Sequence, residues 1–154
     1  TSIRPPLLLR QTVELNLSEE APFFAILELP AGLIETEDRG FDGILNRASA
    51  ETFEETGYSL KPGDFSLLGT APFVSPGVLP ERLFYVHAEV PDIGARSMPQ
   101  GDGSCAEQGS DIMWVSLHKA LNMCENGEII DMKTELGIRR LLSNYSETEN
   151  LKGK

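Results

Sequence analysis

The sequence of 154 residues contains little cysteine and no long apolar run. Its two cysteines, Cys105 and Cys124, match neither a metal-ligand spacing nor a disulfide framework, which favours free thiols in a reducing compartment. No apolar stretch reaches the roughly 18 residues that a membrane-spanning helix needs, and the sequence shows no charged-then-apolar pattern before a small-residue cleavage site, so we expect no secretory leader. We therefore expect a soluble, cytoplasmic protein.

Basic residues are also few: 13 Lys and Arg stand against 24 Asp and Glu, for a formal net charge of −11. This charge argues against sequence-independent binding of nucleic acid and against binding to anionic membranes, because both need a basic face. An acidic protein that handles a phosphorylated substrate must neutralise phosphate locally, and divalent cations are the usual means.

The pattern of apolar residues predicts an α/β or α+β domain over residues 1–146, followed by a polar tail at 147–154. Residues 7–15 are expected to form an edge strand or an arm, because two prolines directly precede them. Further strands are expected at 23–29, 65–71, 83–90 and 112–117. Helices are expected at 44–56, 117–125 and 131–145, with Gly57 and Gly127 as the stops of the first two.

Three glutamates in the first expected helix carry the clearest chemical signal. Glu51, Glu54 and Glu55 stand at i, i+3 and i+4, so all three project from one side of the helix. Such a group is either a solvated acidic face or a set of ligands for a hard cation, which prefers carboxylate oxygens. The helix follows a strand, a Pro-Ala-Gly turn and an acidic loop.

In this order, the runs ELPAG at 28–32 and AETFEETGY at 50–58 resemble the metal-binding loop and helix of the Nudix pyrophosphohydrolases. The resemblance implies a Nudix-type α/β/α sandwich with a mixed sheet. It also implies a Mg²⁺ or Mn²⁺ site formed by Glu51, Glu54, Glu55 and the carbonyl of Ala31, with Glu54 and Glu55 serving catalysis. Gly32, which has no Cβ, would let the backbone approach a diphosphate. The ions would neutralise the phosphates and activate the attacking water.

Other segments resemble the ADP-ribose and nucleotide-sugar pyrophosphatases within that family. Ser75-Pro76-Gly77 with Glu81 is similar to a substrate loop of this subgroup, and Ile3-Arg4-Pro5-Pro6 is similar to the end of one of its strands. The likeness implies substrate contacts from Arg4, Gly32, Ser75, Gly77 and Glu81. It further implies a homodimer. The subgroup's N-terminal subdomain has no counterpart in this sequence. Either the sequence is a fragment of a longer chain, or a second subunit covers the unpaired strand edge that we expect at 3–15.

The chain departs from the family pattern at three further places. The arginine that normally precedes the first helical glutamate is Ala50 here, and Arg47, one turn earlier, is a possible substitute. The loop before the helix is longer than the pattern, which leaves Asp42, Glu35 and Glu37 as alternatives for its acidic residue. In the loop before the strand at 112–117, Glu107 is the nearest substitute for the water-activating acid.

Two functions follow from these observations. The first is a metal-dependent pyrophosphohydrolase that cleaves ADP-ribose or a nucleoside diphosphate sugar into a nucleoside monophosphate and a sugar phosphate. The second is a Nudix-fold protein that binds a ligand or a partner and has reduced or lost catalysis. The intact set of three glutamates favours the enzyme, whereas Ala50 and the altered loop around Glu107 favour the binding protein.

Overall fold

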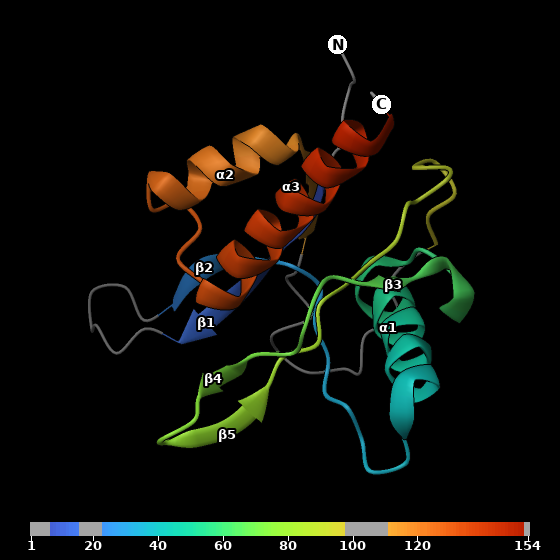
Figure 1. Ribbon diagram of the computed structural model, residues 1–154. Helices are drawn as coiled ribbons and strands as arrows, with labels where there is room; N and C mark the ends of the chain where they lie inside the picture. The colour runs from blue at the N-terminus through green and yellow to red at the C-terminus, as the bar shows by residue number, and fades with distance from the viewer. Residues whose placement is uncertain (1–6, 16–22, 98–110, 153–154) are drawn as a thin grey trace. The chain divides into compact units, whose positions relative to one another are not determined.

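The computed structural model describes residues 7–15, 23–97 and 111–152 (Figure 1). The chain divides into two compact units. The first unit comprises the described residues of Thr1–Pro30 and Gln100–Lys154, and the second comprises those of Ala31–Pro99. Each unit has its own small core and its own antiparallel strands.

The first unit is built on a three-stranded antiparallel sheet of order β2-β1-β7. Its strands are β1 (Leu7–Leu15), β2 (Phe23–Glu28) and β7 (Asp111–Val115). β1 pairs with β7 from Leu7 to Gln11 and with β2 from Arg10 to Leu15. The expectation of an edge strand or arm at 7–15 is therefore wrong. β1 contains no proline, so each of its residues has an N–H group for the ladder, and both flanks are occupied.

The two helices of this unit begin at side-chain caps. Ser116 Oγ accepts a hydrogen bond from Lys119 N–H at the start of α2 (Leu117–Glu125), at 3.2 Å. Asp131 Oδ2 accepts from Thr134 N–H at 2.9 Å, at the start of α3 (Met132–Lys152). α2 has the predicted bounds. α3 continues past residue 145, since residues 146–152 contain neither glycine nor proline.

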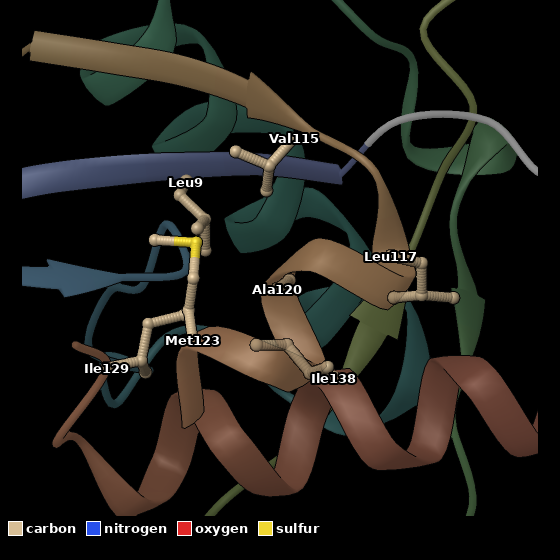
Figure 2. Close-up of a cluster of buried hydrophobic side chains, with 7 residues drawn as sticks. All are labelled: Leu9, Val115, Leu117, Ala120, Met123, Ile129 and Ile138. Carbon is tan, nitrogen blue, oxygen red and sulfur yellow. The ribbon is translucent and has the colours of Figure 1, made fainter. Parts of the chain in front are cut away.

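The core of the first unit joins the sheet to both helices (Figure 2). Strands β1 and β7 contribute Leu9 and Val115, and α2 and its flanking turn contribute most of the rest. The seven buried residues are Leu9, Val115, Leu117, Ala120, Met123, Ile129 and Ile138. A hydrogen bond adds to this packing: Leu29 N–H, directly after β2, donates to the buried Thr134 Oγ1 at 2.9 Å.

The second unit contains helix α1 (Gly40–Thr56), the 3₁₀ turn η1 (Pro62–Asp64) and two short antiparallel ladders. One ladder pairs β3 (Ser66–Leu67) with β6 (Val86–His87), and the other pairs β4 (Phe73–Ser75) with β5 (Leu79–Arg82). Leu45, Leu60 and Phe65 form its buried core, with Ala48, Val86, Ala88 and Val90 packed around them.

The strands expected at 65–71 and 83–90 are thus much shorter than predicted. Gly69 lies within the first of them at φ +74°, a conformation that does not suit a continuous ladder. Every strand pair in the described residues is antiparallel, so they contain no single mixed sheet. The observed class is α+β, with small antiparallel sheets and, in the described ranges, three α-helices.

Within residues 7–15, 23–97 and 111–152, no helix combines the length and the apolar character needed to cross a membrane.

The bond between Leu29 and Thr134 gives a test of the first unit. Thr134→Val keeps the side-chain shape but removes the acceptor, so we expect it to lower the free energy of unfolding by about 1–3 kcal/mol. Amide hydrogen exchange should accelerate at Leu29 in this variant. Thr134→Ser keeps the hydroxyl and should leave the Leu29 amide protected. A protected Leu29 amide in Thr134→Val would contradict the assignment of this bond.

Candidate functional site

Helix α1 carries Glu51, Glu54 and Glu55 on its last two turns. The helix begins at Gly40, earlier than the predicted residue 44, and ends at Thr56, directly before Gly57, as predicted. The φ of +76° at Gly57 is a left-handed conformation, which lets its N–H bond to Phe53 O at 2.9 Å. The glutamates therefore lie immediately before a sharply defined helix end.

Glu55 is the buried member of the three, with 8% of its surface exposed. Its Oε2 accepts a hydrogen bond from the N–H of Ala31 at 3.0 Å. A buried carboxylate is tolerated only with such partners, because an uncompensated buried charge is strongly unfavourable. The bond ties the start of the 31–39 loop to the last turn of α1. Glu55 is therefore not part of a solvated acidic face.

Glu51 packs against the next residue of the same loop. A Cβ placed on Gly32 would overlap Cδ and Oε1 of Glu51. With the Glu51 side chain in this position, only glycine permits the approach of backbone to carboxylate. Two successive loop residues, Ala31 and Gly32, thus meet two carboxylates that stand one helical turn apart.

Glu54, the third member, is exposed. In the part of the chain that the structure describes, no three His, Cys, Asp or Glu side chains converge into a ready-made metal site. The predicted metal set is therefore brought together only in part, at Glu51, Glu55 and the Ala31–Gly32 backbone. Two carboxylates beside a backbone turn fit Mg²⁺, which proteins often hold through one or two carboxylates while it keeps several waters.

Arg47 connects the acidic loop to Glu51. Its Nε donates to Asp38 Oδ2 at 2.8 Å, and its Nη1 lies 3.8 Å from Glu51 Oε1. Asp38 Oδ2 also accepts from Glu35 N–H at 2.9 Å. That backbone hydrogen bond, followed by the one from Arg47, lowers the pKa of the Asp38 carboxyl below its usual value. Arg47 thus contacts both the loop and the first glutamate.

The loop acid that pairs with Arg47 is Asp38, a residue that the sequence pattern did not single out. The choice among Asp42, Glu35 and Glu37 for the acidic residue of the family pattern stays a prediction. Asp42 lies exposed in the first turn of α1. The available signal was local: Asp38 follows Glu35 by three residues, the spacing at which a carboxylate reaches back to a backbone N–H.

The C-terminal end of α1 is closed by residues 92–97. Arg96 Nε donates to Thr56 O at 2.9 Å, and Ser97 N–H donates to Gly57 O at 3.0 Å. Tyr58 Oη donates to Ile93 O at 2.8 Å. A Cβ on Gly57 would overlap Ser97 O, so glycine is required here for space as well as for φ. The sequence indicated only a loop in this segment and gave no sign of its contacts with the helix end.

The remaining predicted substrate residues lie elsewhere or outside the described residues. Ser75, Gly77 and Glu81 belong to the hairpin formed by β4 and β5, where Val78 N–H bonds to Ser75 O at 2.9 Å. Gly77 and Glu81 are exposed, and Ser75 is half-buried. Arg4 and Glu107 lie outside the described residues.

Arg82, in the same hairpin, lies near two aromatic rings in cation–π contacts that the sequence did not reveal. The Arg82 guanidinium carbon lies 5.2 Å from the ring centre of Phe73 and 5.7 Å from that of Phe84. Phe73 and Arg82 are cross-strand partners, which explains the first contact. Both rings remain partly exposed.

The surroundings of His87 and Cys124 favour a structural role for each residue. Burial lowers the pKa of the half-buried His87 in β6, and nearby Glu89 acts in the opposite direction. Cys124 is a free thiol in α2, and burial raises its pKa, which makes it a poorer nucleophile.

No family model matches the chain, and no curated protein matches it either.

The pairing of Asp38 predicts a pH-dependent stability. Because the folded-state pKa is lowered, the ionised carboxylate stabilises the fold at neutral pH. That contribution is lost as the pH falls below the ordinary value of about 3.9 toward the lowered one. Asp38→Asn should therefore be less stable than the wild type at neutral pH, and the difference should shrink on acidification.

Denaturant unfolding across this pH range measures the effect. Asp42→Asn, which removes an exposed carboxylate from the same region, is the control. A difference between Asp38→Asn and wild type that stayed constant with pH would contradict the ion pair.

Proposed function

We propose that the protein is a metal-dependent pyrophosphohydrolase of the Nudix type, acting on ADP-ribose or a nucleoside diphosphate sugar. The observation that carries the proposal is the meeting of Glu51 and Glu55 with Gly32 and Ala31. This arrangement places acidic oxygens beside a backbone position with no side chain. A divalent cation held by these carboxylates would supply the positive charge that a diphosphate needs, and Gly32 adds no side chain of its own to the backbone there.

In this proposal Mg²⁺ or Mn²⁺ neutralises the diphosphate and lowers the pKa of the attacking water when it is bound. Glu51 and Glu55 would hold the cation, together with the carbonyl of Ala31. The hydrogen bond from Ala31 N–H orients the Glu55 carboxylate toward the loop. Glu54 is exposed on the same helix and would hold a second cation or accept a proton from the water.

The proposed reaction is a hydrolysis. Water adds to one phosphorus, the bridging P–O bond breaks, and the products are a nucleoside monophosphate and a sugar phosphate. By resemblance, Arg4, Ser75, Gly77 and Glu81 would contact the substrate and Glu107 would assist the water. Among these, the hairpin residues Ser75, Gly77 and Glu81 are on exposed or half-buried positions that a ligand can reach.

The competing proposal is a nucleotide-binding protein without turnover. It is favoured by the absence, in the described ranges, of a third acidic side chain that converges with Glu51 and Glu55. The two proposals differ in one measurable property, the release of product. Both predict that Mg²⁺ or Mn²⁺ raises the melting temperature after EDTA treatment, because a ligand of the folded state stabilises it.

We expect the wild type to release monophosphate from at least one nucleotide sugar or ADP-ribose in the presence of Mg²⁺ or Mn²⁺. Glu51→Gln and Glu55→Gln should each lower kcat/KM by more than about a hundredfold. Mutating a residue that only hydrogen-bonds to a metal ligand already lowers metal affinity or activity by about 10–100-fold. The amide oxygen that Glu55→Gln introduces can still accept from Ala31 N–H, so this variant should cost only about 1 kcal/mol of stability.

Glu54→Gln is the matched control for folding, since Glu54 is exposed and its substitution should change stability by less than about 0.5 kcal/mol. Metal-dependent binding of ADP-ribose without product release would favour the binding protein. Absence of any metal or nucleotide effect on the melting temperature would exclude both proposals.

We also propose a homodimer, on the resemblance alone. The expectation of an unpaired edge at 3–15 does not hold for the described residues, because β1 is paired on both flanks. Light scattering on the purified chain should give about twice the monomer mass of 16.9 kDa. A monomer at tens of micromolar would contradict this part of the proposal.

A further inference from the structure

We propose that Asp38 and Arg47 form a clasp that positions Glu51 and fastens the far end of the 31–39 loop to helix α1. This inference rests on the proposed function for its catalytic consequence. The clasp is defined as the Arg47 guanidinium together with the Asp38 carboxylate.

The geometry assigns the clasp three contacts. Arg47 Nε and Asp38 Oδ2 are 2.8 Å apart, and Arg47 Nη1 and Glu51 Oε1 are 3.8 Å apart. The third contact runs back into the loop, where Asp38 Oδ2 accepts from Glu35 N–H at 2.9 Å. One guanidinium therefore reaches both the loop and the carboxylate that would hold the cation.

The setting makes this ion pair more constraining than a fully solvated one. The Asp38 and Arg47 side chains are 14% and 26% exposed, and that of Glu51 is 21% exposed. Long side chains in water lose most of the benefit of pairing to entropy and screening. Partial burial and the extra bond from Glu35 N–H restrict both partners of the clasp.

Arginine suits this place better than lysine. Its planar fork presents several donors in fixed directions, so it can face Asp38 with Nε and Glu51 with Nη1 at the same time. A lysine ammonium is a single point charge on a flexible stem. Arg47→Lys should then keep the local charge but lose part of the positioning.

The clasp and the Ala31–Glu55 bond hold the loop at two separate points. Ala31 is fixed at the beginning of the loop and Asp38 near its end, both to residues of α1. Gly32, between these points, packs against Glu51. Releasing Asp38 would free one end of the loop and one side of Glu51.

Positioning and plain electrostatics predict opposite changes in cation affinity. Removing a positive charge beside Glu51 would strengthen the binding of a divalent cation if charge alone mattered. Losing a residue that orients a metal ligand weakens binding, typically by 10–100-fold. The direction of the change therefore separates the two explanations.

The test measures Mn²⁺ affinity by calorimetry on the full chain. We expect the Mn²⁺ dissociation constant to rise about tenfold in Arg47→Ala and to rise by a smaller factor in Arg47→Lys. Arg39→Ala is the matched control, because Arg39 is an exposed arginine of the same loop. It should leave the affinity unchanged or slightly higher. Tighter Mn²⁺ binding by Arg47→Ala would overturn the positioning role.

Amide hydrogen exchange tests the clasp without any metal. Arg47→Ala should accelerate exchange at Glu35 and Asp38, whose N–H groups bond to Asp38 Oδ2 and Glu35 O. Asp38→Asn should have about the same Mn²⁺ affinity as Arg47→Ala. The double variant should bind Mn²⁺ no more weakly than either single variant, as expected for partners in one interaction.

These two measurements separate the possible failures. A wild type that binds no Mn²⁺ would overturn the proposed function, and unchanged exchange at Glu35 and Asp38 in Arg47→Ala would overturn the clasp. Normal Mn²⁺ binding by Arg47→Ala, together with normal binding by wild type, would overturn the clasp and leave the proposed function standing.

Discussion

The hydrogen bond from Ala31 N–H to the buried Glu55 carboxylate fixes the geometry of the candidate site. It joins residues 24 positions apart and holds the loop against the last turn of α1. Because Ala31 is fixed there, Gly32 lies against Glu51, and the loop can run on toward Asp38 and Arg47. Without this bond, Glu55 would be a buried charge with one partner fewer, and the loop would lose its first attachment.

The end of α1 shows a second constraint, imposed by space. Gly57 combines a left-handed φ with a contact to Ser97 O that any Cβ would block. The segment 92–97 therefore returns to the helix that carries the glutamates, through Arg96 and Ser97. Two glycines, Gly32 and Gly57, thus define the site for different reasons: the first allows close approach to a carboxylate, and the second stops the helix.

Local signals in the sequence were sufficient for some elements. The bounds of α2 followed from its periodicity and from Gly127, and the end of α1 from Gly57, because caps act within one turn. Non-local pairing was not predictable in this way. The central place of β1 depends on β7, about a hundred residues later, and the burial of Glu55 depends on Ala31. The spacing of the three glutamates predicted that they share one side of a helix, but it did not predict which of them is buried.

The position of the glutamates at the end of α1 has an electrostatic consequence. The peptide dipoles of a helix sum to about half a negative charge at its C-terminus, where cations are favoured and anions are not. α1 has no basic residue in its last turn, and Glu51, Glu54 and Glu55 lie there or one turn before. The macrodipole and the carboxylates therefore add to one negative potential, which Arg96, at Thr56 O, offsets in part from outside the helix. A positive charge placed at this end, of the kind that the proposed function assigns to a divalent cation, would relieve both sources of repulsion at once.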